Sequence, residues 1–270
     1  MMGAIVGDIV GSVYEFNNIN TKSFPIFSEE SRFTDDTVIT LAVADGLMNA
    51  LGKSDAETRL EVIKSMRAFG QAYPFVGYGQ KFFRWIASSA VMPPYNSYGN
   101  GAAMRVSSAG WLYDTVEDVL KYAKITAMPT HDHPEGIKGA MATAHAIFLS
   151  RTGSSKNEIK SSIEKEYGYE LNKTVRSITK IGHGPETCQV TVPEAMICFI
   201  EGNSFEEVLA NAVSVGGDSD TVGAIAGSIA EAYYGIPYHI KEEAISYLDD
   251  SLLEVVARFA VLMDSKDEDA

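Results

Sequence analysis

Apolar residues recur along most of this chain at spacings of three and four positions, which is the period of an α-helix with one buried face. Residues 37–50 (TVITLAVADGLMNA) are apolar at about two-thirds of their positions, which predicts a helix buried on most sides. The same period predicts further helices at residues 55–73, 81–89, 116–126, 135–150, 156–167, 192–201, 204–216, 221–234, 241–247 and 251–262.

Capping residues mark several of these helix starts. Ser54 and Asp55 precede one helix, and Ser204 with Glu207 forms an S-x-x-E capping box before another. The best strand pattern is CQVTV at residues 188–192, and it is weak beside so many helical segments. We therefore predict an all-α fold, arranged as a single compact multi-helical domain.

The domain organisation follows from what interrupts the pattern. The chain shows no linker, fixed-period repeat or low-complexity tract before its acidic end, DSKDEDA. We predict one domain over residues 1–264 and a disordered acidic tail over residues 265–270. Longer segments without a helical pattern lie at residues 17–32, 90–104 and 168–186, and loops of that length in a helical domain are typically functional.

The charge balance narrows the function classes. The 270 residues include 22 basic and 36 acidic side chains, a formal net charge of -14, which argues against binding to duplex nucleic acid. The N-terminal run MMGAIVGDIVGS lacks the basic start of a signal peptide, and no apolar stretch is long enough to span a bilayer. We expect a cytoplasmic monomer that binds neither nucleic acid nor membranes, with Cys188 and Cys198 as buried thiols.

Two acidic clusters stand directly before apolar helices. They are FTDDTV at residues 33–38 and GGDSDTV at residues 216–222, and each combines two carboxylates with a threonine. Taken singly, each cluster is explained by helix capping, since Asp and Thr satisfy the free amides of a first helical turn.

Taken together, the clusters favour a metal site, because one cap needs only one side chain. If the two helix starts meet, four carboxylates converge and cannot all ionise without cations. Oxygen ligands without a nearby cysteine or histidine select magnesium, manganese or calcium over zinc. Such a group suits a two-metal site that orients a water molecule and a pair of substrate hydroxyls.

Other segments suggest a substrate pocket. In GNGAAMR, residues 99–105, two glycines flank an asparagine, so the backbone amides can turn toward a phosphate, although a plain turn has the same composition. Arg105 can pair with a phosphate or with a structural aspartate. Gly216 and Gly217 allow a close approach to a ligand. His131 and His133 in THDHP are interpreted as substrate-contacting or capping residues rather than as a third metal site. Aromatic candidates for stacking on a base, which can equally be core residues, are Phe75, Tyr95 and Tyr98.

In their order along the chain, these motifs resemble the ADP-ribosylglycohydrolase family, which includes dinitrogenase-reductase-activating glycohydrolases and vertebrate ADP-ribosyl-acceptor hydrolases. The resemblance covers nearly the whole chain. It rests on GDIVGS at residues 7–12 followed by Glu15, FTDDT at 33–37, GNGAAMR at 99–105, Thr130-His131 with His133, and GGDSDT at 216–221.

The resemblance implies an all-α fold with two Mg²⁺ ions, or Mn²⁺ in their place. It implies that one ion is held by Thr34, Asp35, Asp36 and Asp220, and the other by Asp218, Asp220 and Thr221, with Asp220 bridging. Glu15 matches a glutamate that some relatives use as an acid or base on a mobile loop; the alternative is an exposed carboxylate at a loop start. The substrate-binding positions that we carry over are Gly99, Asn100, Gly101, Ala102, Met104, Arg105, His131, Gly216 and Gly217.

The reaction implied is hydrolysis at the anomeric carbon of the distal ribose of an ADP-ribosyl group, where a general acid must protonate the leaving group. ADP-ribose would leave an ADP-ribosylated protein side chain, serine or arginine, or a small metabolite such as O-acetyl-ADP-ribose. The GDIVGSVYE segment with Glu15 is most similar to the O-linked branch.

Two alternatives remain. A non-catalytic ADP-ribose-binding or crystallin-like relative should lose ligands, whereas all six metal-ligand positions and Glu15 are present. A metal-dependent phosphohydrolase would share the aspartates but gives no reason for the GNGAAMR loop.

Overall fold

The structure is a computed structural model that describes residues 1–90, 92–180, 182 and 184–268. Its regular elements in these residues are all helices, which confirms the predicted fold class. The helices are α1 (Met2–Gly11), α2 (Asp35–Asn49), α3 (Asp55–Ala72), α4 (Gln80–Ala87), α5 (Gly101–Met104), α6 (Ser107–Leu112), α7 (Val116–Ala127), α8 (Pro134–Arg151), α9 (Lys156–Tyr167), α10 (Val175–Ile178), α11 (Cys188–Glu201), α12 (Phe205–Val215), α13 (Ser219–Tyr234), α14 (Tyr238–Ile245) and α15 (Asp250–Glu268).

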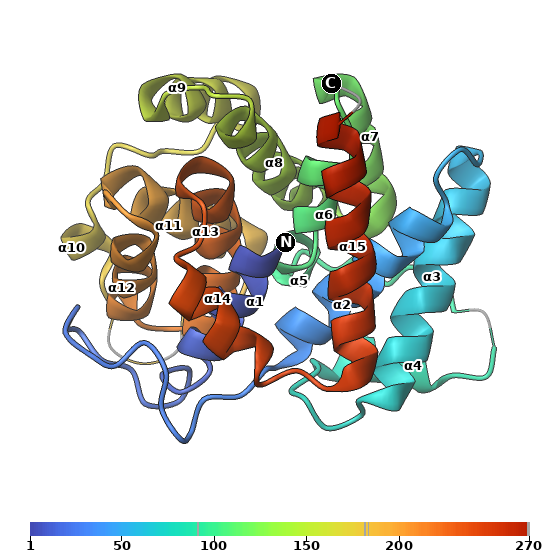
Figure 1. Cartoon of the computed structure of the whole chain (residues 1–270), viewed down its shortest axis with the longest axis horizontal. Helices are drawn as coiled ribbons and strands as arrows, with labels where there is room; N and C mark the ends of the chain where they lie inside the picture. Colours follow the sequence, from blue (N-terminus) through green and yellow to red (C-terminus); the bar gives the residue numbers. More distant parts are fainter. Residues whose placement is uncertain (91, 181, 183, 269–270) are drawn as a thin grey trace.

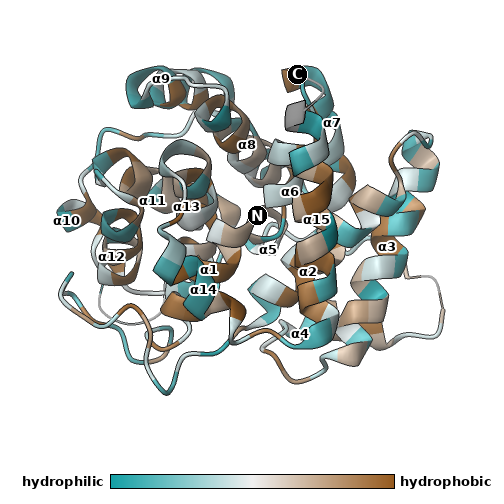
Figure 2. Cartoon of the chain, in the orientation of Figure 1, coloured by the Kyte–Doolittle hydropathy of each residue, from teal (hydrophilic) through white to brown (hydrophobic). Residues whose placement is uncertain are grey.

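The helices form two groups that meet at the N-terminal helix. Helices α9 to α13 lie on one side of α1, while α2, α3, α4 and α15 lie on the other (Figure 1). Peripheral helices such as α3 and α15 carry both hydrophobic and hydrophilic positions, as expected for helices with one face in water (Figure 2). No helix in the part of the chain described is long and apolar enough to cross a membrane.

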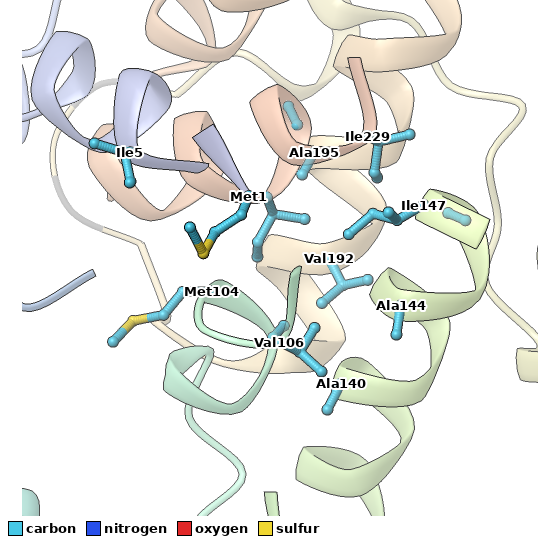
Figure 3. Close-up of a cluster of buried hydrophobic side chains, with 14 of the residues drawn as sticks. Met1, Ile5, Met104, Val106, Ala140, Ala144, Ile147, Val192, Ala195 and Ile229 are labelled. Carbon is cyan, nitrogen blue, oxygen red and sulfur yellow. The ribbon is translucent and has the colours of Figure 1, made fainter. Parts of the chain in front are cut away.

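The core joins helices that are far apart in the sequence. Figure 3 shows Ile5 of α1, Ile147 of α8, Val192 of α11 and Ile229 of α13 around one cluster of buried side chains. Each of these four side chains is at most slightly exposed, so their burial stabilises the packing of α1, α8, α11 and α13 against one another.

Helix α1 was missed by the pattern because it has no polar face. All ten of its residues are buried, so it lacks the alternation on which a periodicity argument depends. It packs on α13 through small residues four positions apart: a Cβ added at Gly3 would stand 2.1 Å from Gly227 O, and one at Gly7 would stand 2.0 Å from Gly223 O. One at Gly11 would stand 2.3 Å from Ser219 O. The two backbones therefore touch, and the end of α1 lies beside the start of α13.

Several local predictions are corrected by the structure. The CQVTV segment is the first turns of α11 and not a strand, because its apolar residues join a longer helical pattern that continues to Glu201. Two of the expected loops contain the short helices α5 and α10, and α6 was not predicted. The acidic end is helical as far as Glu268, since it continues the register of α15, and residues 269–270 lie outside those described.

Both helix N-caps predicted from the sequence are present, but the capping box predicted at Ser204 is only half formed. Ser54 and Glu57 form the full capping box at the start of α3. Ser204 accepts a hydrogen bond from the Glu207 N–H, but the Glu207 carboxylate accepts from the N–H of Asn203, one residue before the cap. The reciprocal half of that box is therefore displaced by one position.

Candidate active site

The two acidic clusters meet, although they lie at opposite ends of the sequence. The Thr221 hydroxyl, at the start of α13, donates a hydrogen bond of 3.2 Å to Asp36 Oδ2, at the start of α2. Oxygens of Glu15, Asp218 and Asp220 lie within 4.8 Å of one another. The positive ends of two helix dipoles thus point at one group of carboxylates, which favours their ionised forms.

Helix capping explains one cluster and not the other. Thr34 is the N-cap of α2, and its side chain accepts a hydrogen bond from the Asp36 N–H. Asp218 occupies the N-cap position of α13 without a side-chain cap bond. Its Oδ2 instead accepts from Asn100 Nδ2 at 2.5 Å. The carboxylate of Asp218 is thus bound by the GNGAAMR loop rather than by the amides of its own helix.

A carboxylate on α1, Asp8, holds the start of α2. It is fully buried and accepts hydrogen bonds from the Thr34 N–H at 2.9 Å and from the Thr34 hydroxyl at 2.7 Å. It also accepts from the Thr37 N–H at 3.0 Å and from the Thr37 hydroxyl. Because the Thr34 hydroxyl donates to Asp8 and accepts from Asp36 N–H, one of its oxygen lone pairs remains for a further partner.

The Asp8→Asn variant is expected to lower the free energy of unfolding by about 3 kcal/mol, since an amide nitrogen cannot accept and leaves buried donors unsatisfied. Urea denaturation followed by circular dichroism measures this loss. Glu242→Gln, which neutralises an exposed carboxylate on α14, is the matched control and should leave the stability unchanged. A loss below about 1 kcal/mol for Asp8→Asn would show that the four hydrogen bonds do not hold this region.

The turn that carries Glu15 is tied to the second cluster by Asn18. The Asn18 side chain donates to Tyr14 O at 2.7 Å and to Gly217 O at 3.0 Å, and it accepts from the Gly217 N–H at 3.0 Å. Gly216 and Gly217 have φ angles of 75° and 79°, which glycine adopts without strain. These glycines therefore shape the backbone beside Asp218.

The GNGAAMR loop is fixed against α11 and His131. The Asn100 N–H donates to Glu186 O at 3.2 Å, and Asn100 Nδ2 also donates to Thr191 Oγ1 at 3.1 Å. A Cβ at Gly101 would stand 3.3 Å from His131 Nε2, so glycine lets the imidazole pack on the loop. Burial lowers the pKa of His131 well below its ordinary value, so the ring is neutral. His133 caps α8 by accepting from the Glu135 N–H, in line with the capping interpretation.

Arg105 is buried within the fold. Its Nη2 donates to Thr126 O at 3.1 Å and to Thr130 Oγ1 at 2.8 Å, while Nε has no hydrogen-bond partner among the described residues. These bonds hold the turn before His131 in place. Neither acceptor is an aspartate, so these bonds are not the pairing with a structural aspartate that the sequence allowed.

A cavity of about 360 Å³ opens beside the acidic group. Of the predicted residues, its walls include Glu15, the aspartates and six positions from the loop and turn, which are Gly99, Asn100, Gly101, Met104, Arg105 and His131. Ala102, Gly216 and Gly217 are not among the lining residues, since Ala102 is buried inside α5 and the two glycines shape the turn behind Asp218.

Sequence reasoning missed one wall of this cavity. It comes from the connection between α3 and α4, with Gly77 and Gly79, and from the start of α4, with Gln80 and Lys81. Gly77 has a φ of 113°, and a Cβ there would stand 3.1 Å from Asp35 Oδ1. The signal was available in the sequence, because G-Y-G at residues 77–79 has the same two-glycine spacing as G-N-G at residues 99–101.

A second cavity, of about 460 Å³, adjoins the first at Glu15, Asp35, Gly77 and Asp220. Its walls otherwise differ, and they include the aromatic residues Phe16, Phe33, Phe75 and Tyr247 beside the polar residues Ser31, Arg32 and Thr34. Of the aromatic residues proposed for stacking on a base, Tyr95 lines the first cavity and Phe75 the second. The ring of Tyr98 lies 5.2 Å from that of His133.

The clustered carboxylates raise one another's pKa values, and a bound cation would offset their mutual repulsion. Burial and the neighbouring charges of Asp8 and Asp218 raise the pKa of Asp35 to about 8, and burial with neighbouring carboxylates raises the pKa values of Asp36 and Asp220 as well. Burial and the charge of Asp218 raise the pKa of Glu15 to about 7.

The donor set fits a hard divalent ion. Asp36 Oδ1 is buried and has no hydrogen-bond partner in the part of the chain described, which leaves it available as a ligand. The oxygens of Thr34, Asp35, Asp36, Asp218, Asp220 and Thr221 supply the carboxylates and hydroxyls that magnesium or manganese takes. Glu15, which the sequence assigned to proton transfer, also lies close enough to Asp218 and Asp220 to contribute an oxygen.

Comparisons with known proteins show what this chain is similar to. A family model described as ADP-ribosylglycohydrolase matches residues 1–269. The chain is 28% identical to the ADP-ribosylhydrolase ARH3 of Mus musculus, over 87% of this chain and 83% of the relative. It is 26% identical to ARH3 of Homo sapiens, over 87% and 84% of the two chains. A solved structure titled ADP-ribosylglycohydrolase-related protein complex matches with a TM-score of 0.67 at 25% identity, covering 97% of this chain and 95% of that one.

Proposed function

Because this chain belongs to the ADP-ribosylglycohydrolase family and is an ADP-ribosyl hydrolase, we propose that it works with two Mg²⁺ ions and releases ADP-ribose from an O-linked serine side chain. The observation that carries the metal dependence is the convergence of Thr34–Asp36 with Asp218–Thr221, joined by the hydrogen bond from Thr221 to Asp36. Mn²⁺ is the expected substitute, since it accepts the same oxygen ligands.

The proposed ligands are Thr34, Asp35, Asp36, Asp218, Asp220 and Thr221. Bound divalent ions would supply positive charge to orient and polarise ribose hydroxyls and a water molecule. The protein's own contribution is to fix the ligands: Asp8 orients the Thr34 hydroxyl, and Asn100 orients the Asp218 carboxylate. Such supporting residues hold a site to the geometry that it needs.

The first cavity suits the nucleotide side of the substrate. Gly77 brings backbone close to Asp35, Gly99 lines the same cavity, and Lys81 supplies a positive charge for a pyrophosphate. Tyr95 offers an aromatic face. The neutral ring of His131 packs under Gly101 and supports this wall.

Glu15 stands where the two cavities adjoin. A side chain in this position can reach the bond between the ribose and the leaving group, so we assign it to protonation of the leaving oxygen. The non-catalytic alternative is disfavoured, because the carboxylates and threonines of both clusters are present in the sequence and Glu15 lies beside Asp218 and Asp220.

Chelation of divalent ions is expected to reduce activity by at least about a hundredfold, because ion-derived stabilisation is worth several kcal/mol. ADP-ribose release is measured from serine-linked and arginine-linked peptides in Mg²⁺, in Mn²⁺ and in EDTA, and excess Mg²⁺ after EDTA should restore the rate. We expect turnover on the serine-linked peptide. Turnover that resists EDTA would overturn the metal dependence, and turnover on the arginine-linked peptide alone would overturn the O-linked assignment.

A further inference from the structure

The second cavity has walls that differ from those of the first. It adjoins the first cavity only through Glu15, Asp35, Gly77 and Asp220, and it shares none of the GNGAAMR loop. A substrate cleaved beside these carboxylates has one part on each side of the broken bond. If the nucleotide part fills the first cavity, the leaving group enters the second.

The base of the second cavity is built from fixed aromatic side chains. The ring of Phe33 lies 6.0 Å from that of Tyr73 in an edge-to-face contact. The Tyr247 ring stacks on Phe27 at 5.7 Å, and its hydroxyl donates to Ser28 O at 3.2 Å. These side chains are ordered before anything binds, so they give up little conformational entropy to a ligand.

The edge of the same cavity carries exposed aromatic side chains. Phe75, between α3 and α4, is 94% exposed, and Phe16, after α1, is 67% exposed. Both line the cavity, and together with Val76 they give its mouth an apolar character. Exposed aromatic residues grouped at a pocket mark surfaces that contact other molecules.

The two cavities therefore differ in chemistry. Glycines, Lys81 and Asn100 line the first together with Phe82 and Tyr95, whereas the second is lined by Phe16, Phe33, Phe75 and Tyr247 beside Ser31 and Arg32. At about 460 Å³ the second cavity lies in the range of about 300–1,000 Å³ typical of sites for sizeable ligands, and it exceeds what an acetyl group needs.

We propose that the second cavity binds the polypeptide that flanks the modified side chain. This inference rests on the proposed function, because it places the polypeptide relative to the bond cleaved at Glu15. Phe16 and Phe75 contact the residues that flank the modified position, and Phe33 and Tyr247 form the floor.

The double variant Phe16→Ala/Phe75→Ala is expected to raise KM for an ADP-ribosylated peptide about tenfold, which corresponds to about 1.4 kcal/mol and is less than the loss of a single aromatic hot spot at an interface. kcat/KM for O-acetyl-ADP-ribose, and the affinity for free ADP-ribose measured by calorimetry, should stay as in the wild type. Leu60→Ala is the matched control, since it removes a side chain that is 64% exposed on α3 and absent from both cavities.

Each other outcome identifies what has failed. An unchanged KM for the peptide, or an equal loss on peptide and O-acetyl-ADP-ribose, would overturn the polypeptide site while the hydrolase assignment stands. Wild-type turnover on O-acetyl-ADP-ribose without turnover on any peptide would overturn it in the same way. A wild-type protein that releases ADP-ribose from none of these substrates contradicts the proposed function itself, and the inference falls with it.

Discussion

Asp220→Asn is expected to lower the rate of ADP-ribose release by about a thousandfold, because the loss of several kcal/mol of stabilisation from a correctly held metal pair corresponds to this factor. Asp220 is buried, lines both cavities, and lies with Glu15 and Asp218 in the group of oxygens within 4.8 Å. Initial rates at saturating Mg²⁺ give the effect on activity.

The same variant should remain folded. Asp220 Oδ1 accepts a hydrogen bond from the Thr221 N–H, which an asparagine oxygen can also accept. Burial and the neighbouring carboxylates raise the pKa of Asp220, so its charged form does not stabilise the metal-free fold. A thermal melt without metal should therefore show no loss of stability. Asp250→Asn, an exposed carboxylate at the start of α15, is the control and should keep full activity. Normal turnover by Asp220→Asn would mean that Asp220 does not bridge the ions.

Gly7→Ala is expected to lower the free energy of unfolding by about 3 kcal/mol, the upper end of what overpacking costs. The added Cβ would stand 2.0 Å from Gly223 O and 2.7 Å from the nitrogen of Ala224. Both neighbours are backbone atoms of α13, so relief requires the helices to separate. Urea denaturation measures the loss, and activity should fall with it because α13 carries Asp218 and Asp220.

The control for this substitution is Gly79→Ala. A Cβ at Gly79 meets no atom within 4 Å, so its stability should change by less than about 0.5 kcal/mol. If Gly7→Ala is as stable as Gly79→Ala, the contact between α1 and α13 yields more easily than the backbone distances imply.

Local pattern was sufficient for the long helices. The segment of α2 is mostly apolar, and Ser54 caps α3, as the sequence indicated. The spacing of apolar residues failed to predict two segments. Helix α1 is buried on every side, so its apolar residues show no helical period. The first five residues of α11 have the pattern of a strand. A short apolar run is compatible with either structure, and length alone decides between them.

Some residues of the candidate site could likewise be recognised from the sequence, and others could not. The carboxylates were visible because Asp and Thr repeat before two apolar helices. Asp8 could not be recognised as part of the site from the sequence. Its role depends on its contacts with Thr34 and Thr37, which only the structure shows. Asn100 was expected to meet the substrate, yet its side chain also holds Asp218, 118 positions away.

By itself the sequence determined the helical class, the oxygen-rich character of the site and the order of its motifs, since these depend on residue type and near neighbours. Only the tertiary structure decided that Thr221 meets Asp36 across 185 positions and that two unlike cavities adjoin at Glu15. The physical reason is the close crossing of α1 and α13. Whether a glycine is required at a position of α1 depends on how near the backbone of α13 lies, which the sequence does not show. That crossing sets the start of α13 beside the end of α1, and Asp8 on the same helix α1 fixes the start of α2.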